Sequence, residues 1–488
     1  MKILNKEVKM QKNFWNHCIF HPTDAVEDAW GKRILDKMAE DKAIQTVRIY
    51  AMLEDIVYLD EDGNLAYDFR VNDVRLDYLV EKGYDILIAY GMLPEIMASD
   101  PSERSSVSKN KTRYKGKMLY VSKPKNVEWW EEICYEYTKH IVERYGVETV
   151  SKWYLHCYNE PDIGCFFMRD ATTEERAEEY FKLYQGFEAG ILRVSDKLHF
   201  GGPALAGWVE FLDIFLKKVK ENNCRLDYLA MHNYAGTTAY NAMERGFCVQ
   251  DWLDLHETLY AVLEKNGFAD AEIVYDEWGM SAQGFRNIEE CPAFIARENE
   301  VFSAYYAKLI HEIIRKNYNI NMLMICLSGQ HEMVTDFSGF RNFFTLNFIK
   351  KPIYNAYVLA SKLGNKLLEK ESETENVFVV PTKKENGDYA ALITYSDAKF
   401  TDNLPEIEET VEFEQDISDK TVTIWCIDKN TTNPYRMFEK MGVEIPDEAQ
   451  LKLLKEEGKM KPVKVQKGTE KITLKLTPNA TFLITVQA

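Results

Sequence analysis

The sequence has no apolar run long enough to cross a membrane, no pair of cysteines in a CxxC spacing and no excess of basic residues. The first absence excludes a membrane-spanning helix, which needs about 20 mostly apolar residues. The formal net charge of −18 argues against nucleic acid as a partner, because phosphate groups would be repelled. This charge fits a soluble protein that meets neutral ligands.

The N-terminus also lacks the features of a secretory signal. Residues 1–17 (MKILNKEVKMQKNFWNH) contain no continuous apolar segment and no small-residue cleavage site. The nine cysteines follow no regular spacing, which indicates free and mostly buried thiols in a reducing compartment. We therefore expect a cytoplasmic protein.

What the sequence does contain is a regular alternation of short strand-like runs with longer helical patterns between residues 14 and 364. The eight runs are 14–20, 43–52, 84–92, 152–160, 197–205, 226–234, 271–279 and 320–328. Eight such alternations predict an α/β fold, a closed parallel (β/α)8 TIM barrel. A doubly wound open sheet is the alternative, but the Gly-rich phosphate turn of that fold is absent after the first run, at His21-Pro22-Thr23.

The alternation of strand-like and helical patterns ends after Gly364. Strand-like runs separated by polar turns follow, with one helical insert at 447–458. This pattern predicts a C-terminal antiparallel β-sandwich domain over residues 365–488, beside a barrel of residues 14–364. Residues 1–13 are expected to add a strand to the sandwich. In the barrel, Thr172 or Thr173 is a candidate helix N-cap and Gly146 a candidate helix stop.

Two glutamates stand at the C-terminal ends of predicted strands. The fourth run ends in CYNEP with Glu160, and the seventh ends in YDEWGMS with Glu277. In a (β/α)8 barrel these strand ends point into one shared cleft, where active sites of this architecture lie. Two carboxyl groups about 5 Å apart suit a retaining glycosidase, in which one is the nucleophile and the other the acid/base. For either glutamate alone, an exposed loop acid is the alternative interpretation.

At these residues the chain resembles glycoside hydrolase family 39, a family of retaining barrel enzymes. The matching segments are WYLHCYNEPDIGCFF (153–167), LHFGGPALAGW (198–208), LDYLAMHNYAG (226–236), AEIVYDEWGMS (271–281) and RNFFTLNFIKKPIYNAYVLASKLG (341–364). They stand in the order of the family and cover most of residues 20–364. The resemblance implies Glu160 as acid/base and Glu277 as nucleophile. It also implies that Asn159 hydrogen-bonds the substrate hydroxyl at C2.

Further site residues follow from the same resemblance. Arg48 would donate a hydrogen bond to the nucleophile and keep it ionised, and Tyr234 would orient the same carboxylate. His232 would line the glycone pocket, and His21 is expected to contact substrate. Trp278 would either stack on a sugar ring or pack in the core. Structural alternatives exist, since Arg48 could close an ion pair at the barrel rim and His232 and Tyr234 could be satisfied core residues.

The chain departs from the family pattern at several positions. Tyr158 and Asp162 stand where members commonly have tryptophan and asparagine, and Tyr50 stands where many have histidine. The eighth run, MICLSGQHE, lacks the aromatic residues often found under the glycone. These departures leave the sugar open. A β-xyloside is the leading expectation, and an α-L-iduronide, arabinoside or galactoside is the alternative.

We therefore expect a retaining exo-glycosidase that acts on short oligosaccharides or glycosides and needs no cofactor or metal. A non-catalytic carbohydrate-binding barrel is one alternative. A metal-dependent isomerase or an aldolase is another, but it would need a ring of His and acidic ligands or a strand-end lysine. No predicted strand end carries such a lysine. Members of the family often self-associate, so the resemblance allows a homo-oligomer.

Overall fold

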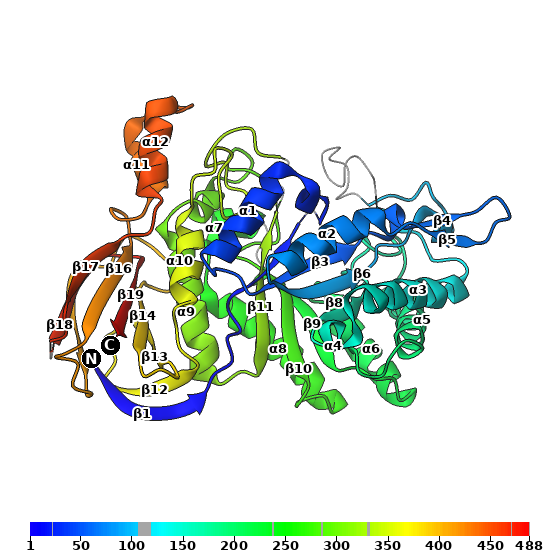
Figure 1. The fold of residues 1–488 in the computed structure, drawn as a ribbon, viewed down its shortest axis with the longest axis horizontal. Coiled ribbons are helices and arrows are strands. Elements are labelled where there is room, and N and C mark those ends of the chain that lie inside the picture. Colours follow the sequence, from blue (N-terminus) through cyan, green and yellow to red (C-terminus); the bar gives the residue numbers. More distant parts are fainter. Residues whose placement is uncertain are drawn as a thin grey trace.

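The computed structural model describes residues 1–21, 23–105, 119–236, 239–284, 286–328, 332–469 and 471–487. Its centre is a closed barrel of parallel strands in the order β10-β11-β2-β3-β6-β7-β8-β9 (Figure 1). These strands are β2 (His17–Phe20), β3 (Thr46–Ala51), β6 (Asp85–Tyr90), β7 (Tyr154–Cys157), β8 (His199–Leu205), β9 (Tyr228–Asn233), β10 (Glu272–Trp278) and β11 (Ile320–Leu327). Each lies inside one of the eight predicted runs, so the predicted (β/α)8 fold is confirmed and the open sheet is wrong.

Helices connect these strands and cover the outside of the barrel. They are α1 (Ala29–Glu40), α2 (Arg70–Glu81), α3 (Val127–Tyr145), α4 (Val147–Val150), α5 (Thr173–Leu192), α6 (Val209–Glu221), α7 (Ala239–Arg245), α8 (Val249–Asn266), α9 (Glu300–Lys316) and α10 (Pro352–Ala360). Thr172 caps α5, because its hydroxyl accepts a hydrogen bond from the backbone N–H of Glu175, whose carboxylate accepts from Thr172 in return. Helix α3 ends at Gly146, where φ is +82° and glycine is favoured.

The connecting loops contain smaller elements that the sequence patterns did not predict. They are the hairpin β4 (Val57–Leu59) and β5 (Leu65–Tyr67), and the 3₁₀ helices η1 (Thr23–Glu27), η2 (Leu53–Asp55), η3 (Glu95–Met97) and η6 (Pro292–Arg297). The hairpin is short and exposed in part, so it lacks the continuous apolar character that identified the barrel strands.

The barrel interior is divided between apolar and polar side chains. Leu87, Ala230 and Met324 belong to a small buried cluster, separate from the large one that joins strands to helices. Arg48 and His232 are also buried, on β3 and β9. Charged side chains are seldom buried unless other groups pair with them, so their presence inside the barrel points to a functional site.

The second sheet has the strand order β17-β16-β19-β14-β13-β12-β1-β15-β18 and lies on the left in Figure 1. Its strands are β1 (Lys2–Met10), β12 (Lys366–Glu371), β13 (Val377–Lys383), β14 (Tyr389–Tyr395), β15 (Ile407–Phe413), β16 (Thr421–Ile427), β17 (Pro462–Lys467), β18 (Lys471–Leu476) and β19 (Ala480–Gln487). Strand β1 pairs antiparallel with β12 and parallel with β15, and the other ladders are antiparallel. The predicted β-sandwich is therefore confirmed.

The two ends of this sheet enclose one core, and its middle packs on the barrel. Ile3 on β1 and Val411 on β15 share a buried cluster with Ile393 on β14. The adjacent residue Leu392 points to the opposite face and belongs to the barrel cluster. Strand β14 is therefore buried on both faces, and α9 lies between the sheet and the barrel (Figure 1).

A helical hairpin of α11 (Pro434–Met441) and α12 (Glu448–Glu457) rises above the sandwich (Figure 1). Its Tyr435 and Leu454 pack against Phe337 and Ile349, which follow β11. We propose residues 14–364 and 365–488 as the limits of the two domains, since α10 ends just before Gly364 and β12 begins just after it.

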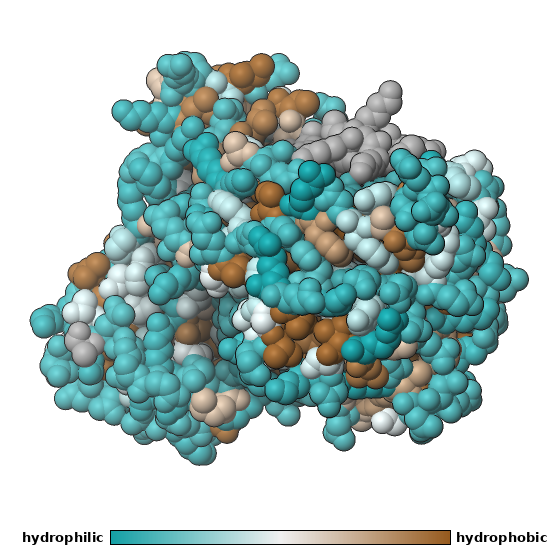
Figure 2. Space-filling view, turned by 45° about the vertical axis from the view of Figure 1, so that its right-hand side comes forward, coloured by the Kyte–Doolittle hydropathy of each residue, from teal (hydrophilic) through white to brown (hydrophobic). Residues whose placement is uncertain are grey.

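Hydrophilic residues cover most of the face shown in Figure 2, and hydrophobic residues gather in separate patches. None of the helices in the described part of the chain combines the length and the apolar character that crossing a membrane requires.

Candidate active site

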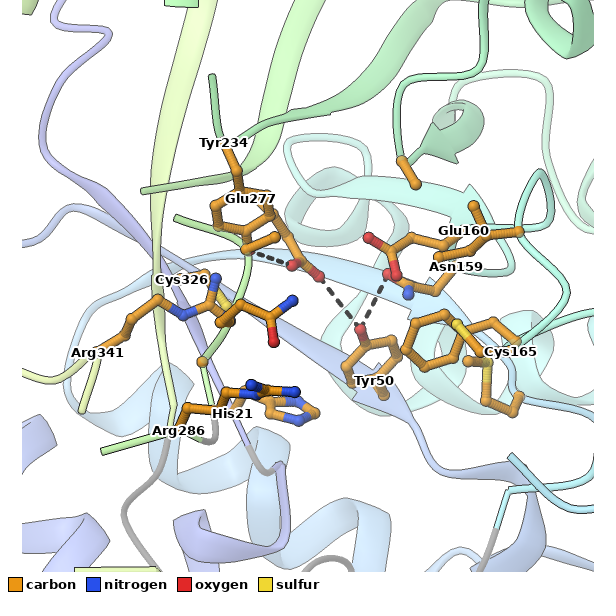
Figure 3. Close-up of a pocket in the computed structure, with 17 residues that line it drawn as sticks. His21, Tyr50, Asn159, Glu160, Cys165, Tyr234, Glu277, Arg286, Cys326 and Arg341 are labelled. Carbon is orange, nitrogen blue, oxygen red and sulfur yellow. Dashed lines mark hydrogen bonds between the residues drawn. The ribbon is translucent and has the colours of Figure 1, made fainter. Parts of the chain in front are cut away.

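A pocket of about 570 Å³ lies where the carboxyl ends of the barrel strands meet. Five of the eight predicted site residues line it: His21, Asn159, Glu160, Tyr234 and Glu277 (Figure 3). The other three lie behind or beside it, as described below. The volume is in the range typical of small-molecule sites.

The two predicted carboxylates face each other in this pocket. Glu277 is on β10, and Glu160 follows the end of β7. One oxygen of each carboxylate and a ring nitrogen of His232 all lie within 4.8 Å of one another. The barrel therefore brings together two acids that are 117 positions apart in the chain, at about the separation that retaining glycosidases use.

Hydrogen bonds hold the carboxylate of Glu277 from both sides. Arg48 Nη1 donates to Oε1 at 2.7 Å, and the hydroxyl of Tyr234 donates to Oε2 at 2.6 Å. Burial disfavours the charged form, but the positive charges of His232 and Arg48 and the bond from Tyr234 outweigh it. The pKa of Glu277 is consequently held well below its usual range, which makes this group a carboxylate at neutral pH.

Asn159 is fixed by its side-chain oxygen. That oxygen accepts hydrogen bonds from Arg48 Nη2 at 2.6 Å and from the hydroxyl of Tyr50 at 2.9 Å. Because the oxygen is used inside the protein, the amide nitrogen is the group left to donate to a ligand hydroxyl. Tyr50, which replaces the histidine common in the family, is thus part of the site (Figure 3).

His232 does not line the pocket as expected. Its ring is fully buried behind the carboxylates, with Nδ1 2.7 Å from Oε1 of Glu160 and Nε2 3.5 Å from Asp276 and 3.8 Å from Glu277. Burial favours the neutral ring, but the charges of Glu277 and Asp276 outweigh it and raise the pKa of His232 to about 10. The ring is therefore protonated at neutral pH and its Nδ1–H donates to Glu160.

Trp278 packs instead of facing the pocket. Its side chain is fully buried and contacts the rings of Phe302, Tyr305 and Tyr306 on α9. It is not among the residues that line the cavity. Of the two roles left open by the sequence, packing is the one that matches this position.

Asp276 is a site residue that sequence reasoning missed. Its carboxylate lies 3.2 Å from Arg48 Nε, 3.3 Å from His156 Nε2 and 3.5 Å from His232 Nε2. Neighbours on a strand normally point to opposite faces, yet Asp276 and Glu277 both reach this buried group. The pairing of β10 with β9 explains this, because its register shifts by one residue between Tyr275 and Glu277.

Two arginines form another part of the pocket wall. Arg286 follows β10 and Arg341 follows β11 (Figure 3). Arg341 donates to the Ser328 hydroxyl at 3.1 Å and to the backbone oxygen of Ser281 at 3.3 Å. Among the described residues, no carboxylate oxygen lies within 4.0 Å of either guanidinium, although the charge of Arg341 helps to lower the pKa of Glu277. These two guanidinium groups therefore add positive charge to a pocket that also contains Glu160 and Glu277.

Glu160, His232 and Glu277 are also the one group in the described ranges whose ligand atoms cluster closely enough to hold a metal ion. The protonated state of His232 opposes metal binding, because both ring nitrogens then carry hydrogen. His331, in the HE pair of the eighth run, lies outside the described residues.

Comparison with known proteins agrees with this geometry. The family described as glycosyl hydrolases family 39 matches residues 2–471. The chain belongs to this family. A β-xylosidase of Caldicellulosiruptor saccharolyticus is 25% identical over 456 residues, which are 88% of this chain and 85% of that protein. An α-L-iduronidase of the dog is 29% identical over 163 residues, 33% of this chain and 21% of that protein.

The fold has a solved counterpart as well. The crystal structure of a monomeric β-xylosidase from Caulobacter crescentus superposes with a TM-score of 0.82 at 18% identity, covering 100% of this chain and 99% of that one. Membership of family 39 supports glycosidase activity on a carbohydrate substrate.

Proposed function

We propose that the protein is a retaining exo-glycosidase that removes terminal sugars from short oligosaccharides or glycosides, with β-xylosides as the leading substrate. The observation that carries this proposal is the approach of Glu160 and Glu277 to within 4.8 Å across the pocket. The β-xylosidase from Caldicellulosiruptor saccharolyticus, similar over most of both chains, supports the choice of sugar.

The proposed reaction has two steps. The carboxylate of Glu277 attacks the anomeric carbon while Glu160 gives its proton to the departing glycosidic oxygen. Glu160 then takes a proton from water, which attacks the anomeric carbon and releases Glu277. Arg48 and Tyr234 keep Glu277 ionised and oriented for the first step, since both donate to its oxygens. The Asn159 amide is placed to bind the hydroxyl at C2.

A panel of 4-nitrophenyl glycosides tests the proposal. We expect hydrolysis of the β-D-xyloside. Glu277→Ala should lower kcat by at least about 10³-fold, since removal of a catalytic nucleophile in other hydrolases causes losses of this size or larger. Glu257→Ala, which removes a surface glutamate bound to Tyr318, is the matched control and should retain wild-type rates. Binding of sugars without hydrolysis would instead support the non-catalytic carbohydrate-binding alternative.

A glycone that carries a carboxylate, such as an α-L-iduronide, is the second candidate. The observation that favours it is the pair of arginines, Arg286 and Arg341, in the pocket wall without a carboxylate partner among the described residues. Guanidinium groups bind carboxylates in a bidentate manner. The similarity to the canine α-L-iduronidase over a third of this chain points the same way.

The two candidates are separated by comparing an aryl α-L-iduronide with an aryl β-D-xyloside. If the glycone is anionic, Arg341→Gln should lower kcat/KM for the iduronide by about 10- to 100-fold, the loss expected for a hydrogen bond to a charged group. The xyloside should then be a poor substrate for both proteins. Preference for the xyloside, with little effect of the substitution on its KM, would reject the second candidate.

We propose a cytoplasmic site of action on short imported glycosides. All nine cysteines are free thiols in the structure, which suits a reducing compartment. Thiol titration of unfolded protein purified without reductant should give nine reactive groups. Sedimentation of the intact protein tests whether it forms a homo-oligomer.

A further inference from the structure

The backbone at Glu160 adopts an unusual conformation. Its φ is +49°, in the left-handed region that residues other than glycine rarely enter. Such a conformation is strained and persists only where surrounding contacts enforce it. One contact is known: the N–H of Glu160 donates to the backbone oxygen of Ala204, on β8, at 2.9 Å.

The second contact comes from Asp162, two residues further on. Its Oδ1 accepts from the backbone N–H of Ala206 at 2.9 Å, and its Oδ2 accepts from those of Gly207 and Trp208, both at 3.1 Å. These three N–H groups belong to the segment between β8 and α6. Asp162 is fully buried, and the proposed mechanism does not use it. The backbone of Glu160 is therefore bound to β8, and the residue two positions later is bound to the connection between β8 and α6.

We propose that Asp162 is a positioning residue that sets the carboxyl group of Glu160 for proton transfer to the leaving group. This inference rests on the proposed function, in which Glu160 is the acid/base. The contact between Asp162 and the segment 206–208 also reaches the pocket wall. Ile163, next to Asp162, and Ala206, one of the three donors, both line the cavity.

A carboxylate matches the three N–H donors of this contact better than an amide does. An asparagine, which members of the family commonly have here, offers one oxygen, and its NH2 group would face the N–H of Gly207 and Trp208. A carboxylate accepts from all three donors at once. Burial raises the pKa of Asp162 to about 6 against the opposing effect of the N–H groups of Ala206 and Trp208, so the group is ionised at neutral pH.

Leaving-group dependence distinguishes a positioning role from a merely structural one. Glycosides with a good leaving group, such as 2,4-dinitrophenol, need little protonation in the first step, whereas phenyl glycosides need the acid. For Asp162→Ala we expect kcat/KM for phenyl β-D-xyloside to fall by about 10- to 100-fold, part of the 10²–10⁴-fold that general acids supply. The value for the 2,4-dinitrophenyl glycoside should change by less than about 3-fold. If the panel selects another sugar, the same pair of leaving groups is used on it.

Asp397→Ala is the matched control. In the sandwich, Asp397 also accepts from backbone N–H groups, those of Lys399 and Thr401, at 2.9 and 3.0 Å. This variant should keep the wild-type ratio between the two substrates. If Asp162→Ala does not fold, Asp162→Asn, which keeps one acceptor, should show the same selective loss to a smaller extent.

The outcomes separate this inference from the proposed function. An equal loss for both leaving groups, or no loss in a folded variant, overturns the positioning role of Asp162. Glu160→Gln must show the larger selective loss for the phenyl glycoside. If Glu160→Gln shows none, the acid role of Glu160 fails. If Glu160→Gln shows the selective loss for the phenyl glycoside and neither Asp162 variant shows it, only the inference about Asp162 fails.

Discussion

His232 donates a 2.7 Å hydrogen bond from Nδ1 to Oε1 of Glu160, from a position fully buried beneath the pocket. Its other nitrogen faces Asp276 and Glu277. One protonated ring thus contacts both proposed catalytic carboxylates, and Asp276 supplies part of the negative charge that keeps it protonated.

Asp276→Asn should therefore lower the pKa of His232 from about 10, since it removes a charge and a hydrogen bond that raise this pKa. A ¹⁵N NMR titration of the histidine rings measures the shift directly. Asp227→Asn, which alters a carboxylate just before β9, is the control. An unchanged His232 titration in the Asp276 variant would show that this carboxylate does not set its charge.

Tyr234→Phe should weaken the reaction without unfolding the protein. A hydrogen bond to a charged group contributes about 1.5–3 kcal/mol, so kcat/KM should fall by about 10- to 100-fold. Because the lost bond lowers the pKa of Glu277, the acid limb of the pH profile should move to higher pH. Tyr318→Phe removes a similar bond to Glu257 on the surface and should leave the profile unchanged. A Tyr234 variant with a wild-type acid limb would contradict the role given to this hydroxyl.

The thermal stability of the protein should fall on both sides of neutral pH. Glu277 has a lowered pKa, so its contribution to the free energy of unfolding is present above its unfolded value of 4.5 and is lost as pH falls. His232 has a raised pKa, so its contribution is present below 6.5 and is lost as pH rises through about 10. Calorimetry at pH 3.5, 6 and 10 tests this, and Glu277→Gln should flatten the acid side. An equally steep acid side in that variant would contradict the assignment.

The barrel and both glutamates could be predicted from the sequence for one physical reason. Parallel strands buried on both faces are continuous apolar runs, and a glutamate that ends such a run stands out. The sequence patterns did not reveal that Asp276 also points inward. This orientation results from a shift in strand register, which cannot be recognised from the types of residue in the strand. The burial of His232 behind the carboxylates, which matches the core-residue alternative, also depends on tertiary packing that residue type does not reveal.

Strand β17 of the sandwich gives no clear strand signal in the sequence, for another physical reason. Strand β17 lies at one edge of the sheet and is mostly exposed, and lysines alternate with valines along it. Edge strands commonly carry charge, which protects them from pairing with other chains but removes the apolar signal. Arg341 was missed as a pocket residue because it follows β11 in a long connection whose path the sequence does not specify.

Trp278→Phe separates packing from sugar stacking. The indole is buried against the aromatic rings of α9, so the smaller ring should destabilise the fold by about 1–3 kcal/mol. The KM for an accepted glycoside should change by less than about 2-fold, since the side chain does not line the pocket. Denaturant unfolding and initial rates measure the two effects. A large rise in KM at unchanged stability would restore the stacking role.

In the proposed reaction, Glu277 forms a covalent bond to the sugar and Glu160 then directs water to the same face. Proton NMR of an aryl glycoside during its first minutes of hydrolysis, in deuterated buffer, reports the configuration of the sugar before mutarotation. We predict that the first-formed anomer has the configuration of the substrate. Release of the opposite anomer would contradict the account, because one displacement by water needs no bond to Glu277.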